Sequence, residues 1–275
     1  MSGVSVLGKI VARTRLRVFE KRRELPLDRI LSMAPTPGGR RQFATAVSTP
    51  GRINVIAEFK RRSPSRGTIR DDLHPVMVAQ AYEVGGAAAL SVLTEEEYFG
   101  GSLDDLQQAR SATLLPTLRK DFVVDPYQVW ESWIAGTDAV LLIVAALSDA
   151  ELKTLLATAA ETHLDALVEV HDREELARAL DAGARLVGVN NRDLATMKVS
   201  LDVALELGPA IPEDVVTVAE SGIKSGADVR RLRDAGFDAF LIGEHLMLAP
   251  DPGVALEALL AESGGGAPGA PSDGE

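Results

Sequence analysis

The sequence predicts an α/β fold in which eight parallel strands close into a (β/α)8, or TIM, barrel that follows an N-terminal helical extension. Three observations predict this fold. Eight short, almost wholly apolar runs recur along the chain, helix-length segments separate them, and the junctions AGTDAVLLI, AGARLVGVN and AGFDAFLIG resemble one another. Parallel strands that are covered on both sides have this apolar character, and such a barrel usually needs ~250 residues.

The eight runs are too short for helices, and we expect each to form one strand. They are residues 53–59, 88–93, 114–118, 138–144, 164–170, 185–190, 215–219 and 238–242. An open doubly wound sheet is the competing architecture, but it usually has fewer strands and, when it binds nucleotides, a glycine-rich loop after the first one. No such loop follows the first run here.

Start and stop signals mark several of the intervening helices. Asp125-Pro126 is an N-cap followed by proline at the first helical position. Capping-box spacing occurs at Ser148 with Glu151 and at Asp172 with Glu175. Glycine at a helix end commonly adopts a left-handed conformation, which we expect at Gly85, Gly136, Gly183 and Gly236.

These signals divide the chain into three parts. Residues 1–50 form a helical extension of one or two helices packed on the barrel, 51–262 form the catalytic barrel, and 263–275 form a disordered tail rich in glycine and proline. The extension carries ten Lys/Arg and three Asp/Glu, and we expect it to pair with acidic neighbours on the barrel surface.

Composition excludes several classes of protein. The net charge of −11 argues against nucleic-acid binding, and no segment has the length and apolarity of a membrane span or a signal peptide. The chain contains no cysteine, which excludes disulfides and thiol catalysis and favours a cytoplasmic location. The four histidines show no metal-ligand spacing, so we expect no metal.

Polar and charged residues gather where the predicted strands end. In this barrel, catalytic groups come from the C-terminal ends of the strands. Those ends supply Glu58, Lys60, Thr94, Glu95, Lys120, Asp121, Glu169, His171, Asn190, Arg192, Glu220, Ser221, Gly222, Gly243 and Glu244. Two lysines and three glutamates at one mouth would form an acid–base centre, in which each lysine lowers the proton affinity of the other and the glutamates raise it.

The same mouth predicts an anion site and an apolar slot. Ser63 and Ser65 supply hydroxyls, and Gly222 and Gly243 let backbone amides approach a ligand in the two loops that usually bind phosphate in this barrel. The carboxylate of Glu244 would have to point away from such a phosphate. A planar ring could lie among Tyr98, Phe99, Phe122, Leu93, Leu141, Leu194 and Leu241, although core packing is the ordinary alternative for each.

Seven of these segments, taken in order, resemble a known family. They are IAEFKRRSPSRG, SVLTEEEYFGGS, LRKDFVVDPYQV, ALVEVHD, GVNNRDL, AESGI and LIGE, within residues 52–248. The chain is similar to indole-3-glycerol phosphate synthase, the ring-closing enzyme of tryptophan biosynthesis. The resemblance implies 1-(2-carboxyphenylamino)-1-deoxyribulose 5-phosphate, a phosphosugar joined to anthranilate, as substrate, with no metal or organic cofactor. The expected state is a monomer or a weak homodimer.

The resemblance also implies roles for individual residues. Lys120 resembles the general acid that protonates the ketone, Lys60 the group that pairs with the substrate carboxylate and assists dehydration, and Glu169 the partner general base. Glu58 and Asn190 would orient these groups. The remaining implied contacts are Glu220, Arg192 and Ser221 for positioning the substrate, Ser63, Gly222, Gly243 and Glu244 for the phosphate, and Phe99, Phe122, Leu93 and Leu141 for the anthranilate ring.

Other functions remain open at this point. A different phosphosugar barrel such as phosphoribosylanthranilate isomerase shares the anion loops, but its family uses a cysteine base, which this chain lacks. A Schiff-base aldolase could use Lys60 or Lys120 as nucleophile. A third alternative is a binding or scaffold protein that has lost catalysis, although the complete set of lysines and glutamates argues against it.

Overall fold

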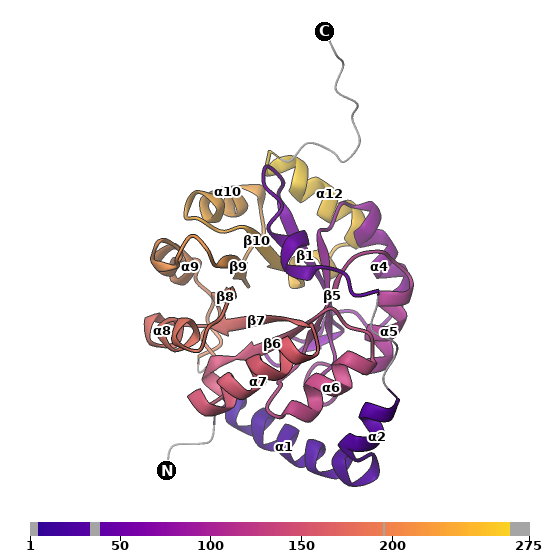
Figure 1. The fold of residues 1–275 in the computed structure, drawn as a ribbon. Coiled ribbons are helices and arrows are strands. Elements are labelled where there is room, and N and C mark those ends of the chain that lie inside the picture. Colours follow the sequence, from indigo (N-terminus) through magenta and orange to yellow (C-terminus); the bar gives the residue numbers. More distant parts are fainter. Residues whose placement is uncertain (1–4, 34–38, 195, 265–275) are drawn as a thin grey trace.

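The predicted barrel is present in the computed structural model, which describes residues 5–33, 39–194 and 196–264 (Figure 1). Eight parallel strands close in the order β1-β10-β9-β8-β7-β6-β5-β4. Their bounds are β1 Asn54–Phe59, β4 Ala89–Leu93, β5 Thr117–Lys120, β6 Ala139–Ile143, β7 Asp165–Val170, β8 Leu186–Asn190, β9 Val216–Glu220 and β10 Ala239–Ile242.

Helices surround this barrel on its outer face. They are α4 Pro75–Val84, α5 Leu103–Ser111, α6 Pro126–Ile134, α7 Asp149–Glu161, α8 Arg173–Asp181, α9 Asp202–Leu207, α10 Gly226–Asp234, α11 Glu244–Met247 and α12 Pro252–Glu262, with the 3-10 turns η1 Val144–Ala146 and η2 Gly208–Ala210. One buried cluster fills the space between strands and helices, and a second fills the barrel interior. This layering explains the strand pattern, because both faces of each strand are packed.

One predicted strand is misplaced. We expected residues 114–118, but β5 runs from Thr117 to Lys120. Leu114 is 83% exposed and precedes the strand, whereas Arg119 is buried within it. The prediction relied on apolar residues, whereas two of the four residues of β5 are charged. It therefore placed the start of the strand about three residues too early.

The helix signals are largely confirmed. Ser148 and Glu151 form a reciprocal capping box, and Asp125 caps α6. The side chain of Asp172 caps α8, although Glu175 does not return the bond. Gly136, Gly183 and Gly236 have positive φ, as predicted.

The prediction for Gly85 is wrong. It has a φ of −69°, and the left-handed residue is Gly86 at +90°. Gly85 instead allows close helix packing, because a Cβ there would lie 2.6 Å from the carbonyl oxygen of Gly253 at the start of α12.

The described part of the extension contains three helices rather than one or two: α1 Val6–Glu24, α2 Leu27–Ser32 and α3 Phe43–Val47. Phe43 and Val47 of α3 are fully buried with the interior residues and close the end of the barrel where the strands begin. In Figure 1, α1 and α2 lie beside α6 and α7.

The expected pairing of the basic extension with acidic neighbours is confirmed. Its ion pairs include Arg13–Glu97 at 3.2 Å, Arg15–Glu151 at 2.8 Å, Lys21–Glu131 at 2.9 Å and Arg22–Asp125 at 2.9 Å. Exposed pairs of this kind contribute ~0.2–1 kcal/mol each.

The loop after β1 contains further regular structure. A small hairpin that the sequence analysis missed, β2 Arg62–Ser63 and β3 Gly67–Thr68, follows β1.

No helix in the described residues has the length and apolarity needed to cross a bilayer. The predicted tail, 263–275, lies outside the described residues from position 265 onward.

Candidate active site

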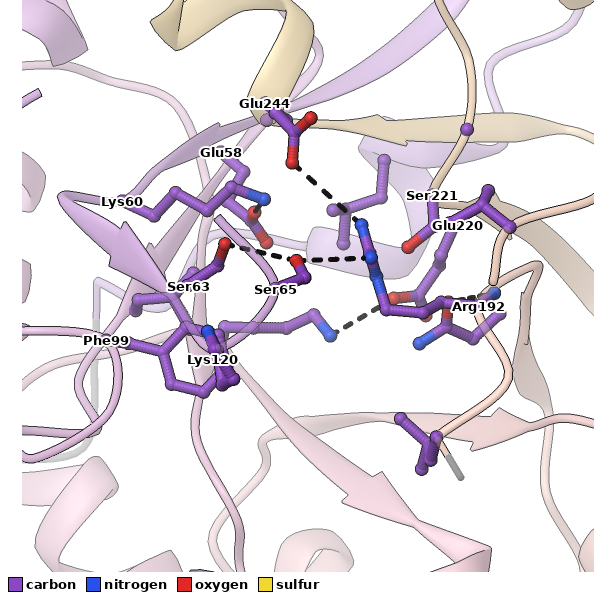
Figure 2. A pocket seen from close by; sticks show the side chains of 18 of the residues that line it. Glu58, Lys60, Ser63, Ser65, Phe99, Lys120, Arg192, Glu220, Ser221 and Glu244 are labelled. Atoms are coloured by element: carbon purple, nitrogen blue, oxygen red, sulfur yellow. Dashed lines mark hydrogen bonds and ion pairs between the residues drawn. The ribbon is translucent and has the colours of Figure 1, made fainter. Parts of the chain in front are cut away.

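One cavity of about 630 Å³ lies at the C-terminal ends of the strands, and Figure 2 shows its wall. All sixteen residues to which the family resemblance gives a role line it: Glu58, Lys60, Ser63, Leu93, Phe99, Lys120, Phe122, Leu141, Glu169, Asn190, Arg192, Glu220, Ser221, Gly222, Gly243 and Glu244. A cavity of this size suits a small organic ligand. The barrel therefore brings together groups that are up to 186 positions apart in the chain.

Strand alternation places the first acid–base pair. Successive side chains of a strand point to opposite faces. Ala57 and Phe59 pack in the outer core between strands and helices, whereas Glu58 and Lys60 line the cavity. Lys60 Nζ lies 2.8 Å from Glu58 Oε1, so this ammonium and this carboxylate form an ion pair on the cavity wall.

Lys120 lies between two glutamates from other strands. Its Nζ donates a hydrogen bond to Glu169 Oε2 at 2.9 Å and forms an ion pair with Glu220 Oε2 at 3.1 Å. Burial disfavours the ammonium form, but the charges of Glu169, Glu220 and Glu58 outweigh this effect and raise the pKa of Lys120. Lys120 is therefore held as an ammonium.

This result corrects one expectation from the sequence. We expected Lys60 and Lys120 to lower the proton affinity of each other. Instead, each ammonium has its own carboxylate within 3 Å, and the glutamates dominate the surroundings of Lys120.

A glycine in the neighbouring strand makes room for Glu220. A Cβ at Gly188 would lie 2.2 Å from Glu220 Oε1, so the carboxylate fills the space that a side chain would occupy. Glu220 Oε1 is buried and has no hydrogen-bond partner among the described residues. Any larger residue at position 188 would move Glu220 away from Lys120.

The residue after Glu220 has an unusual backbone. Ser221 has a φ of +65°, a conformation that costs a non-glycine residue of order 1–3 kcal/mol and is often found at functional sites. Asn191 Nδ2 donates to the carbonyl oxygens of Glu220 and Ser221, at 2.9 and 3.1 Å. This buried amide supports the conformation that presents Ser221 to the cavity.

Cationic and hydroxyl groups gather at one side of the cavity. Arg192 Nη1 donates to Ser65 Oγ at 3.3 Å, and the hydroxyls of Ser63 and Ser65 are 3.3 Å apart. Glu244 pairs with Arg66 at 3.0 Å. It also lies 4.0 Å from Arg192, and Figure 2 marks this second pair with a dashed line. The carboxylate of Glu244 thus points toward these arginines.

Apolar side chains form another part of the wall. The rings of Phe99 and Phe122 are 6.2 Å apart and tilted by 40°. Leu93, Leu141, Leu194 and Leu241 also line the cavity, but Tyr98, which we had placed in this slot, does not. Glu95 shapes the loop that carries Phe99, because its carboxylate accepts hydrogen bonds from the backbone N–H groups of residues 97, 98 and 99.

The sequence analysis missed several lining residues. Val6, Leu7 and Ile10 of α1 reach the cavity, as do Arg66 and Lys224. The signal for Arg66 was its place in the serine-rich loop after the first strand. No signal identified α1, since its contact with the cavity depends on how the extension packs on the barrel.

Of the remaining strand-end residues, Asp121 lines the cavity, whereas Thr94 and His171 lie behind its wall. Thr94, Arg119 and Asp121 form a buried network, with Arg119 Nη2 3.0 Å from Asp121 Oδ2. His171 Nε2 lies 3.3 Å from Glu169 Oε1.

In the described ranges, no cluster of three or more His, Asp or Glu could hold a metal ion.

Comparisons with known proteins agree on one family. A family model described as indole-3-glycerol phosphate synthase matches residues 7–259. A protein of that name from Carboxydothermus hydrogenoformans is 47% identical over 262 residues, covering 93% of this chain and 99% of the relative. Another from Acidithiobacillus ferrooxidans is 48% identical over 257 residues, covering 92% of this chain and 98% of the relative.

Solved structures with low sequence identity share the fold alone. Thiamine phosphate pyrophosphorylase from Pyrococcus furiosus has a TM-score of 0.58 at 18% identity, covering 77% of this chain and 96% of its own. N-acetylmannosamine-6-phosphate 2-epimerase from Clostridium perfringens has a TM-score of 0.58 at 15% identity, and the match covers 77% of this chain and 93% of the epimerase.

Proposed function

The chain belongs to the indole-3-glycerol phosphate synthase family, and on that premise we propose how the residues of its cavity share the work of ring closure. The activity is that of a decarboxylating lyase of tryptophan biosynthesis. It converts 1-(2-carboxyphenylamino)-1-deoxyribulose 5-phosphate to indole-3-glycerol phosphate, carbon dioxide and water. The substrate therefore brings a phosphate, a carboxylate, a ketone and an aromatic ring to the cavity.

Lys120 is the general acid of ring closure. As the aromatic carbon attacks the ketone carbon, the carbonyl oxygen becomes an alkoxide and needs a proton. Lys120 is held as an ammonium by Glu169 and Glu220, so a proton is available in the resting enzyme. An alkoxide is more basic than an amine, and transfer becomes favourable once the new bond forms. General acid catalysis of this kind contributes ~10²–10⁴-fold in rate.

The two glutamates beside Lys120 have different tasks. Glu169 is the general base that removes a proton in the later loss of water, and Glu220 positions the substrate near Lys120. Asn190 helps to orient the loop after β8, because its Oδ1 accepts a hydrogen bond from the backbone N–H of Arg192 at 3.0 Å.

Lys60 binds the carboxylate of the substrate and then assists dehydration. Its partner in the free enzyme is Glu58, 2.8 Å away. A carboxylate on the substrate can share the ammonium while Glu58 keeps it in place. When carbon dioxide leaves, Lys60 is freed to stabilise the departing hydroxyl.

The phosphate binds where Arg192 meets the serine-rich loop. Ser63, Ser65 and Arg192 supply donors, and the backbone at Gly222 and Gly243 adds further amides. Ser221 and Glu244 flank this region, where Glu244 holds the arginines until the phosphate arrives. The anthranilate ring lies among the apolar side chains of Phe99, Phe122, Leu93 and Leu141.

A Schiff-base mechanism is less compatible with this geometry. Amine attack on a carbonyl needs the neutral amine, whereas Lys120 is buried between two carboxylates that favour its ammonium form. We therefore expect no covalent adduct after borohydride treatment in the presence of substrate.

The protein acts as a monomer or weak homodimer in the cytoplasm. A chain without cysteine suits a reducing compartment, and the cavity is lined within one chain. Sedimentation at micromolar concentration should give a mass near 29.2 kDa. A stable larger assembly would contradict this proposal.

The observation that carries these assignments is the position of Lys120 between Glu169 and Glu220, on the same cavity wall as Lys60 with Glu58. Glu169→Gln tests the base. We expect this variant to slow the dehydration step more than ring closure in single-turnover kinetics. An unchanged rate of indole formation would remove Glu169 from its role.

A further inference from the structure

Lys120 alone does not distinguish between the two glutamates beside it. Its Nζ lies 2.9 Å from Glu169 and 3.1 Å from Glu220, and both carboxyl side chains are only 2% exposed. Two buried carboxylates that share one ammonium repel each other, which favours the uptake of a proton by one of them. A general base must be ionised to accept a proton, so the site must determine which glutamate keeps its charge.

His171 breaks this near-symmetry, because it lies behind Glu169 and away from Glu220. Its Nε2 is 3.3 Å from Glu169 Oε1, and its Nδ1 is 3.0 Å from Glu175 Oε2 at the start of α8. Glu175 Oε2 also accepts the backbone N–H of His171 at 2.9 Å. The ring is mostly buried and is not among the described residues that line the cavity.

We propose that His171, held by Glu175, is a positioning residue that keeps Glu169 ionised and directs the shared proton to Glu220. The inference rests on the role proposed for Glu169 as the general base. It adds a division of labour between the two glutamates and a residue outside the cavity that enforces it.

The electrostatics of the surrounding elements support this division. The charged groups around the centre are Glu169 of β7, Glu175 of α8, Lys120 of β5, Glu220 of β9 and Glu58 of β1. Burial favours the neutral form of Glu169, but Lys120 and then His171 outweigh it and lower its pKa. For Glu220, burial and the charge of Glu169 exceed the opposing effect of Lys120 and raise the pKa.

His171 itself is charged at neutral pH. Burial disfavours the imidazolium, yet its ion pairs with Glu169 and Glu175 outweigh this effect and raise the pKa of His171 to about 10. A cation so close to Glu169 Oε1 favours its carboxylate, whereas Glu220 forms an ion pair only with Lys120 among the described residues. Removal of the imidazolium should therefore let the proton spread from Glu220 to Glu169.

His171→Gln is the direct test, since glutamine keeps a hydrogen-bonding side chain but carries no charge. The measured quantity is the single-turnover rate of indole formation between pH 3 and 10. We expect the pH at which the acidic limb is half-maximal to rise by about one unit, since Glu169 would lose a neighbouring cation. At pH 7 the rate should fall several-fold, while KM stays within about twofold because His171 does not touch the cavity.

Asp172→Ala is the matched control. Asp172 caps α8 through the backbone N–H of Glu175 at 2.8 Å, so its removal loosens the same helix without removing a cation from Glu169. It should lower the unfolding temperature and leave the acidic limb in place. The proposal is wrong if His171→Gln leaves the limb unmoved, or if Asp172→Ala moves it by the same amount.

A measurement on the unmodified protein covers the case in which His171→Gln does not fold. In ¹⁵N-histidine spectra at pH 8, both ring nitrogens of His171 should carry protons, with the other three histidines assigned by substitution. A neutral ring at pH 8 would overturn the proposal. If instead Glu169→Gln were fully active, the role of Glu169 as base would fall, and this inference would fall with it.

Discussion

The carboxylate of Glu58 lies directly against Gly243, on the neighbouring strand end. A Cβ at position 243 would lie 2.4 Å from Glu58 Oε1 and 2.9 Å from Glu58 Cβ. The absence of a side chain at Gly243 therefore lets Glu58 reach Lys60. This contact gives Gly243 a task besides the approach of its backbone to the phosphate.

Gly243→Ala should consequently impair catalysis. The added methyl group would displace Glu58, and displacement of a catalytic group by about 1 Å can cost ~10²-fold in rate. We expect kcat to fall by about ten- to a hundredfold, measured by indole absorbance. Gly183→Ala is the control: Gly183 has a φ of +93° and no atom near its missing Cβ, so this change should cost ~1 kcal/mol of stability without loss of kcat. Equal kcat values for the two variants would contradict the role of Gly243.

Glu244→Gln should improve substrate binding rather than weaken it. Its carboxylate pairs with Arg66 and lies near Arg192, where it would compete with the phosphate. An exposed pair is worth ~0.2–1 kcal/mol, so KM should fall by about two- to fivefold at constant ionic strength. Arg192→Gln should raise KM at least tenfold, because a charge-assisted bond to phosphate contributes ~1.5–3 kcal/mol. A rise in KM for Glu244→Gln would mean that Glu244 holds the substrate directly.

Arg119→Met should destabilise the fold strongly. Arg119 is 2% exposed and pairs with Asp121 at 3.0 Å and Glu131 at 2.9 Å. Its removal leaves buried carboxylates without their main partner, which costs ~3–5 kcal/mol. Urea unfolding measures this loss. Arg13→Met, which breaks the exposed pair with Glu97, should cost less than ~1 kcal/mol, and similar losses in both variants would contradict the account.

The ion pairs of His171 should make stability depend on pH. The pKa of His171 is raised from 6.5 to about 10 in the folded protein. A raised histidine pKa adds stability that is complete below pH 6.5 and is lost as pH rises toward 10. The difference in unfolding free energy between the native protein and His171→Gln should therefore shrink from pH 6 to pH 10. A difference that stays constant over this pH range would contradict the assignment.

The sequence predicted most of the barrel because both faces of its strands are buried. It failed at β5, where the charged Arg119 and Lys120 belong to the strand and Leu114 does not. Arg119 is buried through ion pairs with the nearby residues Asp121 and Glu131, and a search for apolar runs does not detect such pairs. The small hairpin after β1 was missed for a similar reason, since two-residue strands carry no periodicity.

The sequence indicated which strand ends meet at the cavity but not the geometry within it. Alternation along β1 indicated that Glu58 and Lys60 share a face, whereas the contacts of Gly188 with Glu220 and of Gly243 with Glu58 depend on strand register. The sequence also left open whether the other lysine or the glutamates dominate the pKa of Lys120, because this depends on which charges lie closest in space. The contribution of α1 to the cavity wall depends on tertiary packing alone.

The central claim is that Lys120, held as an ammonium between Glu169 and Glu220, supplies the proton for ring closure. The most direct measurement compares Lys120→Met with the native protein in single-turnover formation of indole and in calorimetric binding of the substrate. We expect the rate to fall by ~10²–10⁴-fold while the dissociation constant changes little. A variant that forms indole at close to the native rate would contradict the claim.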